Sequence, residues 1–118
     1  DFLFKSFRKK KIINLFDDMY TSTLDVKTCA KIIIDLAIIP SRGIYNVGAR
    51  NMISKKNFAI LMSKTLKLKI NYRNISCGSL DVPRGKNLGL NVKKIEQKLN
   101  YSMPTIKQSV RSLAKNYK

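Results

Sequence analysis

The sequence predicts an α/β domain with short strands and about five helices. Apolar residues recur every three or four positions over several stretches, as they do on one face of an α-helix. Other stretches, shorter and rich in Ile, Leu and Phe, have the pattern of strands. The two kinds of stretch alternate along the chain, which is typical of α/β proteins, and 118 residues fit one domain.

The first half of the chain is expected to begin with a helix over 2–7, followed by a strand over 12–16. Thr23 is the expected N-cap of a second helix, which ends near Pro40 because proline cannot continue it. A second strand is predicted over 44–48, closed by Gly48. The apolar residues that define the second helix are Val26, Cys29, Ala30, Ile33, Leu36 and Ala37.

The second half is expected to begin with a helix capped by Ser54, whose apolar face runs over 58–66. Apolar and polar residues alternate over 68–75, which predicts a half-buried strand. After a glycine-rich loop, two short helices are predicted, one capped by Asn91 and one beginning at Pro104. The faces that carry Ile33 and Leu61 are expected to expose apolar surface.

The net charge of +17 comes from 24 Lys and Arg against 7 Asp and Glu. A charge of this size is common in proteins that bind nucleic acids or anionic membranes. Here Lys outnumbers Arg 18 to 6, and apart from the run over 8–11 the lysines are spread along the chain. Arginine and aromatic residues do not cluster as they do at nucleic-acid interfaces. The composition therefore favours a solvated surface charge, with neither a nucleic-acid partner nor a membrane span.

The residues that would support autonomous catalysis are missing from the sequence. The chain has no His, which excludes the Ser-His-Asp and Cys-His arrangements, and its 2 Cys do not form a metal-binding motif. The five glycines fit neither the dinucleotide-binding nor the Walker pattern. Asp17 and Asp18 are adjacent, so at a strand end they point in different directions and do not form an acid/base pair. These residues alone predict a binding domain.

Five residues near the C-terminus occur in a familiar register, namely Arg84, Asn87, Leu90, Lys94 and Glu96. This register resembles the C-terminal signature of the dTDP-4-dehydrorhamnose reductase family, a branch of the extended short-chain dehydrogenases/reductases. Shorter stretches at 13–23, 43–48 and 54–59 are similar to further motifs of that family, in the same order. A relative that acts on another nucleotide sugar fits the same residues.

The resemblance implies that residues 1–118 are the C-terminal, substrate-binding part of such an enzyme, with a partial Rossmann-type fold. It implies an activity in which NADPH or NADH reduces a nucleotide-linked 4-keto sugar. The cofactor and the catalytic Tyr-x-x-x-Lys pair would belong to an N-terminal Rossmann half outside this chain, so no catalytic residue is expected here. The implied setting is cytoplasmic, with a nucleotide-sugar substrate and with room for a homodimer.

Arg84 is the first candidate for contact with substrate, because its planar guanidinium group suits the oxygens of a diphosphate. Asn87 is expected to order the same loop. Asp17 and Asp18 form a second candidate group, which would line the pocket. Pairing of Arg84 with a carboxylate, and a turn at 17–23 that caps a helix, are the structural alternatives.

Three other functions stay open at this point. A non-catalytic relative that serves as a regulatory subunit would lack the Tyr-x-x-x-Lys pair in its N-terminal half. A small basic nucleic-acid-binding domain would show steeply salt-dependent binding. An epimerase or dehydratase of the wider superfamily fits the Arg84–Glu96 register less well.

Overall fold

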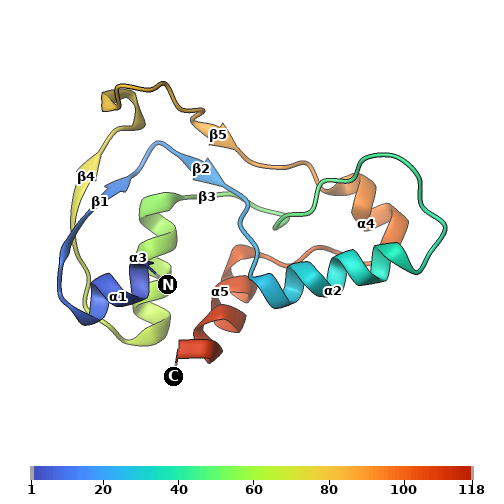
Figure 1. The fold of residues 1–118 in the computed structure, drawn as a ribbon, viewed down its shortest axis with the longest axis horizontal. Helices are drawn as coiled ribbons and strands as arrows, with labels where there is room; N and C mark the ends of the chain where they lie inside the picture. The colour runs from blue at the N-terminus through green and yellow to red at the C-terminus, as the bar shows by residue number, and fades with distance from the viewer. Residues whose placement is uncertain (1, 118) are drawn as a thin grey trace.

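The computed structural model describes residues 2–117 and has the predicted α/β class, with short strands and five α-helices in the described range (Figure 1). The helices are α1 (Phe2–Arg8), α2 (Val26–Ala37), α3 (Lys55–Leu66), α4 (Lys93–Leu99) and α5 (Ile106–Ala114). The strands are β1 (Ile12–Phe16), β2 (Tyr20–Thr21), β3 (Ile53–Ser54), β4 (Asn71–Ile75) and β5 (Asn87–Leu88). Single 3₁₀ turns, η1 (Cys77–Ser79) and η2 (Lys115–Tyr117), follow β4 and α5.

The longest strands, β1 and β4, pair in parallel from Ile12 opposite Asn71 to Phe16 opposite Ile75. Parallel pairing places both amino ends at one edge of the sheet and both carboxyl ends at the other. A second sheet has β2 in the middle, antiparallel to β3 and parallel to β5. This second sheet brings the loop after β4 back to the carboxyl end of β1 (Figure 1).

Two apolar cores hold these elements together. In β1 the side chains of Ile13 and Leu15 are buried while those of Ile12 and Asn14 face solvent, which is the alternation of a half-buried strand. The first core joins β1 to α1, α3 and α5, and the second joins α2 to α4 and the α4–α5 connection. The second core consists of the buried residues Ile32, Val92, Ile95 and Met103.

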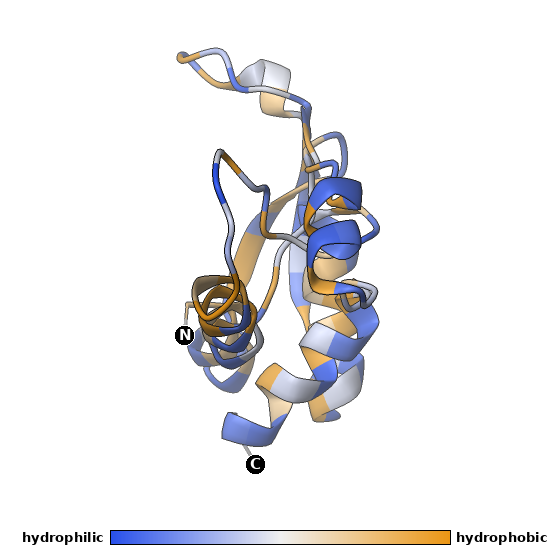
Figure 2. Cartoon of the chain, turned by 90° about the vertical axis from the view of Figure 1, so that its right-hand side faces the viewer, coloured by the Kyte–Doolittle hydropathy of each residue, from blue (hydrophilic) through white to orange (hydrophobic). Residues whose placement is uncertain are grey.

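The molecule is a thin slab, with principal extents of 47 × 36 × 17 Å. Hydrophobic and hydrophilic residues alternate along its helices, as expected for elements with one packed face (Figure 2). Within residues 2–117, no helix has both the length and the apolar character needed to cross a membrane.

The helix caps agree with the prediction at α3 and differ from it at α2. The hydroxyl of Ser54 accepts the N–H of Asn57 at 3.1 Å, which confirms the predicted cap. At α2 the cap is Asp25, not Thr23, and its carboxylate accepts the N–H of Thr28 at 3.1 Å. Thr23 lies two residues too early, and its hydroxyl group pairs with that of Thr21 instead.

The predicted strand over 44–48 is wrong, because this segment is irregular in the structure. Hydrogen bonds with the distant segment 91–94 take the place of pairing with a neighbouring strand. The amide of Asn46 donates to the carbonyl oxygen of Asn91 at 3.1 Å, and the ammonium group of Lys94 donates to that of Ile44 at 2.8 Å. The Ile44 side chain is 86% exposed, so the apolar pattern does not mark a buried strand.

The expected exposure of apolar surface is found at α2 but not at α3. In α2 the buried residue is Ile32, and Ile33 next to it is 52% exposed. Leu61 of α3 is half-buried and packs against the first core. The periodicity therefore predicts both helices but misplaces the inward face of α2.

We predict that Glu96→Ala destabilises the connection between α4 and α5. The Glu96 carboxylate accepts the N–H of Met103 at 2.6 Å, and Met103 is buried in the second core. Removing the acceptor leaves this N–H unpaired, which costs about 1–3 kcal/mol of unfolding free energy in a urea titration. Gln97→Ala, at the exposed neighbouring position, is the control and should change stability by less than about 0.5 kcal/mol. An equal loss in both variants would contradict this role of Glu96.

Candidate functional site

The candidate site lies where the parallel strands β1 and β4 end. Asp17 and Asp18 directly follow β1, and Ser76 and Cys77 directly follow β4. Because the register of the two strands is fixed by pairing along their whole length, these four residues meet at one edge of the sheet. Loop side chains at such an edge are well placed to contact ligands.

Asp18 links the two strand ends. Its Oδ2 accepts the Ser76 hydroxyl at 2.6 Å, and its Oδ1 accepts the Cys77 N–H at 2.8 Å. The hydrogen bond from Ser76, followed by that from Cys77, lowers the pKa of Asp18 from its ordinary value of 3.8 to about 2. The Asp18 carboxylate is therefore charged at neutral pH, and both of its oxygens accept hydrogen bonds from within the protein. Asp18 positions the loop after β4, which is a structural role for a residue that the sequence offers as a substrate ligand.

Cys77 is buried beside this link, in surroundings that disfavour its thiolate form. Burial raises the pKa of its thiol group, and the neighbouring Asp18 carboxylate raises it further. Only a thiolate is an effective nucleophile, so a thiol with a raised pKa is chemically inert at neutral pH.

The loop after η1 returns to the strand ends through backbone pairing. The Tyr20 N–H donates to the carbonyl oxygen of Lys86 at 2.7 Å, and Tyr20 stands opposite Asn87 in the β2–β5 pair. The Asn87 side chain then accepts the N–H of Gly89 at 3.0 Å. This short turn orders the loop at the point where it meets β2.

A shallow, open hollow of about 500 Å³ lies beside these contacts. Three of the four residues singled out from the sequence line it, and Arg84 does not. Arg84 lies in the exposed part of the same loop, and no ion pair joins it to an acidic residue within the described part of the chain. The lining residues are Asp17, Asp18, Tyr20, Met52, Lys86 and Asn87.

Sequence reasoning missed Lys86, which is the cation closest to the hollow. Its ammonium group lies 3.8 Å from the Asp18 carboxylate, and its side chain is 69% exposed. The signal was present, because Lys86 lies in the same glycine-containing loop as Arg84, two positions later. Asp17 is turned toward α3, with its carboxylate 3.7 Å from the ammonium group of Lys56.

A nicotinamide dinucleotide does not fit this strand end. Its pyrophosphate needs backbone N–H groups from a glycine-rich turn that leads into a helix. β1 is instead followed by Asp17 and Asp18, with no glycine-rich turn into a helix, and one nearby N–H, that of Cys77, already binds Asp18. Residues 2–117 also offer no group of three or more His, Cys, Asp or Glu side chains that could hold a metal ion.

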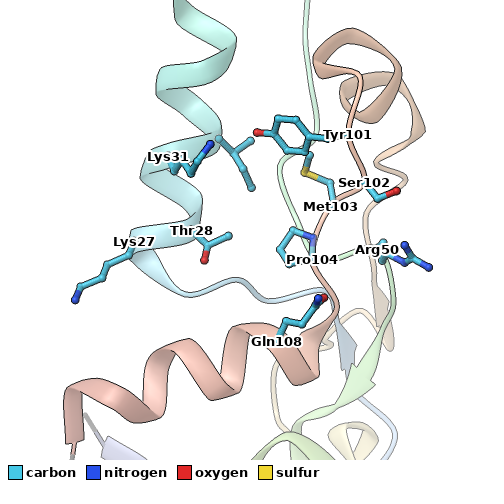
Figure 3. A pocket seen from close by; sticks show the side chains of 10 residues that line it. Lys27, Thr28, Lys31, Arg50, Tyr101, Ser102, Met103, Pro104 and Gln108 are labelled. Atoms are coloured by element: carbon cyan, nitrogen blue, oxygen red, sulfur yellow. The ribbon is translucent and has the colours of Figure 1, made fainter.

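A second hollow of about 480 Å³ separates α2 from the α4–α5 connection (Figure 3). Across it, the Tyr101 hydroxyl donates to Asp35 at 2.8 Å, and the ammonium group of Lys31 pairs with the same oxygen at 2.5 Å. Burial, and then the hydrogen bond to Asp35, raise the pKa of Tyr101 to about 12. Lys27 and Arg50 point away from the hollow on opposite sides (Figure 3), so its cations do not converge on a ligand. We therefore interpret this hollow as a gap left where α2 packs against the α4–α5 connection.

Comparison with known proteins identifies the fold and gives no match by sequence. No family model and no curated protein matches the sequence. Among solved structures, dTDP-4-dehydrorhamnose reductase from Bacillus anthracis in complex with NADP is 17% identical, with a TM-score of 0.86, and the match covers 99% of this chain and 42% of that one. The same enzyme from Yersinia enterocolitica is 14% identical, with a TM-score of 0.83 and coverages of 98% and 42%. UDP-N-acetylglucosamine 4-epimerase from Methanobrevibacter ruminantium is 13% identical, with a TM-score of 0.78 and coverages of 98% and 37%.

The chain therefore has the fold of a part of an extended short-chain dehydrogenase/reductase, as the resemblance predicts. It spans about two fifths of the length of these solved proteins. Several of these solved neighbours are in complex with NADP, NADPH or NAD, and some contain a UDP-linked sugar.

We predict that the link through Asp18 persists in acid well below the pH at which most carboxylates are protonated. A carboxyl group whose pKa is lowered by folding stabilises the fold above its ordinary pKa, and this contribution is lost as the pH falls through the folded value. Protection factors of the hydrogen-bonded amides of Cys77, Gly78, Ser79 and Leu80, which divide out the pH dependence of the intrinsic exchange rate, should therefore hold at about pH 4 and fall toward pH 2.

In Asp18→Asn these amides should exchange faster at neutral pH and show no such acid transition, because the amide carries no charge. Asp81→Asn is the matched control, since Asp81 is exposed in the same loop. The same exchange profile in the protein with and without Asp18→Asn would contradict the positioning role.

Proposed function

We propose that this chain is the substrate-binding part of an NAD(P)H-dependent reductase that resembles dTDP-4-dehydrorhamnose reductase. Its substrate would be a nucleotide-linked 4-keto sugar, as in the synthesis of dTDP-rhamnose or a related deoxysugar. The cofactor and the catalytic groups would belong to a part of the protein outside these 118 residues. The observation that carries the proposal is the hollow at the carboxyl ends of β1 and β4, in a fold shared with such reductases.

The loop at the rim of this hollow carries two cations that can contact the diphosphate of such a substrate, whereas Asp17 and Asp18 in its lining lie beside Lys56 and Lys86. Lys86 lines the hollow, and Arg84 lies two residues earlier in the same exposed loop. The Arg84 guanidinium group has no carboxylate partner in the described range, so it can turn toward a diphosphate and bind two of its oxygens. Asn87 keeps the loop in place while the cations contact substrate.

The acid/base properties of the hollow suit substrate binding and do not suit proton transfer. Asp18 has a pKa of about 2 and is bound by Ser76 and Cys77, so it holds no proton to donate at neutral pH. The chain would therefore bind and orient the nucleotide sugar, and hydride and proton transfer would take place at groups in the other part of the protein.

The test is an assay of the complete natural protein with NADPH or NADH and a dTDP-linked 4-keto-6-deoxy sugar. Loss of reduced-nicotinamide absorbance is the expected result. If the complete protein neither binds NAD(P)H nor reduces a dTDP-, UDP- or GDP-linked 4-keto sugar, the proposed reaction is wrong.

We predict that Arg84→Ala raises KM for the nucleotide sugar about tenfold or more and leaves kcat within about twofold. The loss of a charge-assisted hydrogen bond costs about 1.5–3 kcal/mol, and contacts remote from the reacting ketone act mainly on binding. Arg42→Ala removes the same charge from an exposed loop outside the hollow and serves as the control. An unchanged KM in Arg84→Ala, in an enzyme that is active, would exclude Arg84 from the substrate site.

A further inference from the structure

The opposite end of the β1–β4 pair gathers positive charge. Because the strands are parallel, the segments that enter them lie together (Figure 1). The Asn71 amide at the start of β4 donates to the carbonyl oxygen of Lys10 at 3.1 Å, which joins the two segments directly. We call this surface the basic end, and it comprises the exposed residues Arg8, Lys9, Lys10, Lys11, Lys64, Lys67 and Lys69.

No acidic residue occurs in the two stretches that build the basic end, 2–16 and 55–75. Between described residues, none of the seven cations of the basic end takes part in an ion pair, and Lys56 of α3 pairs with Asp17 at the other end of β1. Uncompensated like charges at close range raise the local positive potential and disfavour the compact state. The charge is therefore concentrated here, although the sequence suggests that it is spread.

Two of the lysines occupy backbone positions that favour glycine. Lys10 has φ of 51° and Lys67 has φ of 56°, both in the left-handed region, and Lys67 is the C-cap of α3. Glycine adopts this conformation without steric cost and is common where helices end. Lysine at both turns keeps a charge at the cost of local backbone strain.

An open hollow of about 490 Å³ adjoins the basic end on β4. Tyr72, 39% exposed, and Arg73 line it together with Ile12, Ile70 and Asn71. A cationic surface beside an exposed aromatic ring is the usual arrangement for binding single-stranded nucleic acid, in which lysines follow the phosphates and bases stack on rings. A membrane-binding surface requires a broad apolar face among its cations, and here the exposed apolar side chain next to the lysine run is Ile12.

We propose that the basic end binds single-stranded nucleic acid without sequence selectivity, with Tyr72 as the stacking surface. This site lies at the opposite end of the β1–β4 pair from the hollow assigned to the nucleotide sugar. It goes beyond the reductase function and does not depend on it.

The test measures fluorescence anisotropy of a labelled oligo-dT with the complete natural protein over a range of salt concentrations. Binding should weaken with salt, with a slope of about −0.7 in log K against log salt for each phosphate contacted. In Lys10→Gly/Lys67→Gly the slope should become shallower by about 1.4 and the affinity at moderate salt should fall about tenfold or more. Glycine relieves the strain at both turns, so this variant loses charge without losing the fold.

Two further variants distinguish binding at the basic end from nonspecific attraction to the protein's overall positive charge. Lys93→Gln/Lys98→Gln removes the same charge from α4 and should leave the affinity within about twofold. Tyr72→Ser should weaken oligo-dT binding about fivefold or more with an unchanged salt slope, because it removes stacking and no charge.

The proposal fails if the wild-type protein does not bind oligo-dT at low salt. It also fails if the α4 variant loses as much affinity as the basic-end variant, or if Tyr72→Ser binds as tightly as the wild type. Vesicles of phosphatidylglycerol that bind the protein and displace the oligonucleotide would identify a membrane surface instead.

Discussion

The parallel pairing of β1 with β4 is the constraint on which the rest of the structure depends. Over five residue pairs it fixes which ends of the two strands coincide. The carboxyl ends bring together Asp17, Asp18, Ser76 and Cys77, and the amino ends bring together the lysine-rich segments. One backbone register thus creates an anion-binding candidate at each end, with different side chains and different expected ligands.

Short polar contacts extend this framework to the loops. Asp18 connects the strand ends and positions the loop that carries Lys86 and Asn87, while β2 receives that loop through backbone pairing. On the far side, Glu96 and Lys94 hold the α4–α5 connection and the irregular 44–48 segment. Residues of the C-terminal register therefore have defined structural roles here, separate from that proposed for Arg84.

Local sequence patterns predict the elements that depend on interactions between residues close together in the chain. The five helices, the strand at 12–16 and the Ser54 cap follow from periodicity and capping chemistry within a few residues. The two-residue strands β2, β3 and β5 could not be predicted, because each exists only through pairing with a distant segment. The same limit affects the site: the sequence shows a loop with Arg84 and Lys86 but does not show which cation faces the hollow.

The most direct test of the substrate site is hydrogen exchange of the complete protein with and without a stable dTDP-hexose. The account predicts slower exchange at 17–21 and 76–90, around the hollow, and no change at 8–11 or 64–69, at the basic end. Protection confined to other segments at saturating ligand, or no protection at all, would contradict a nucleotide-sugar site at the carboxyl ends of β1 and β4.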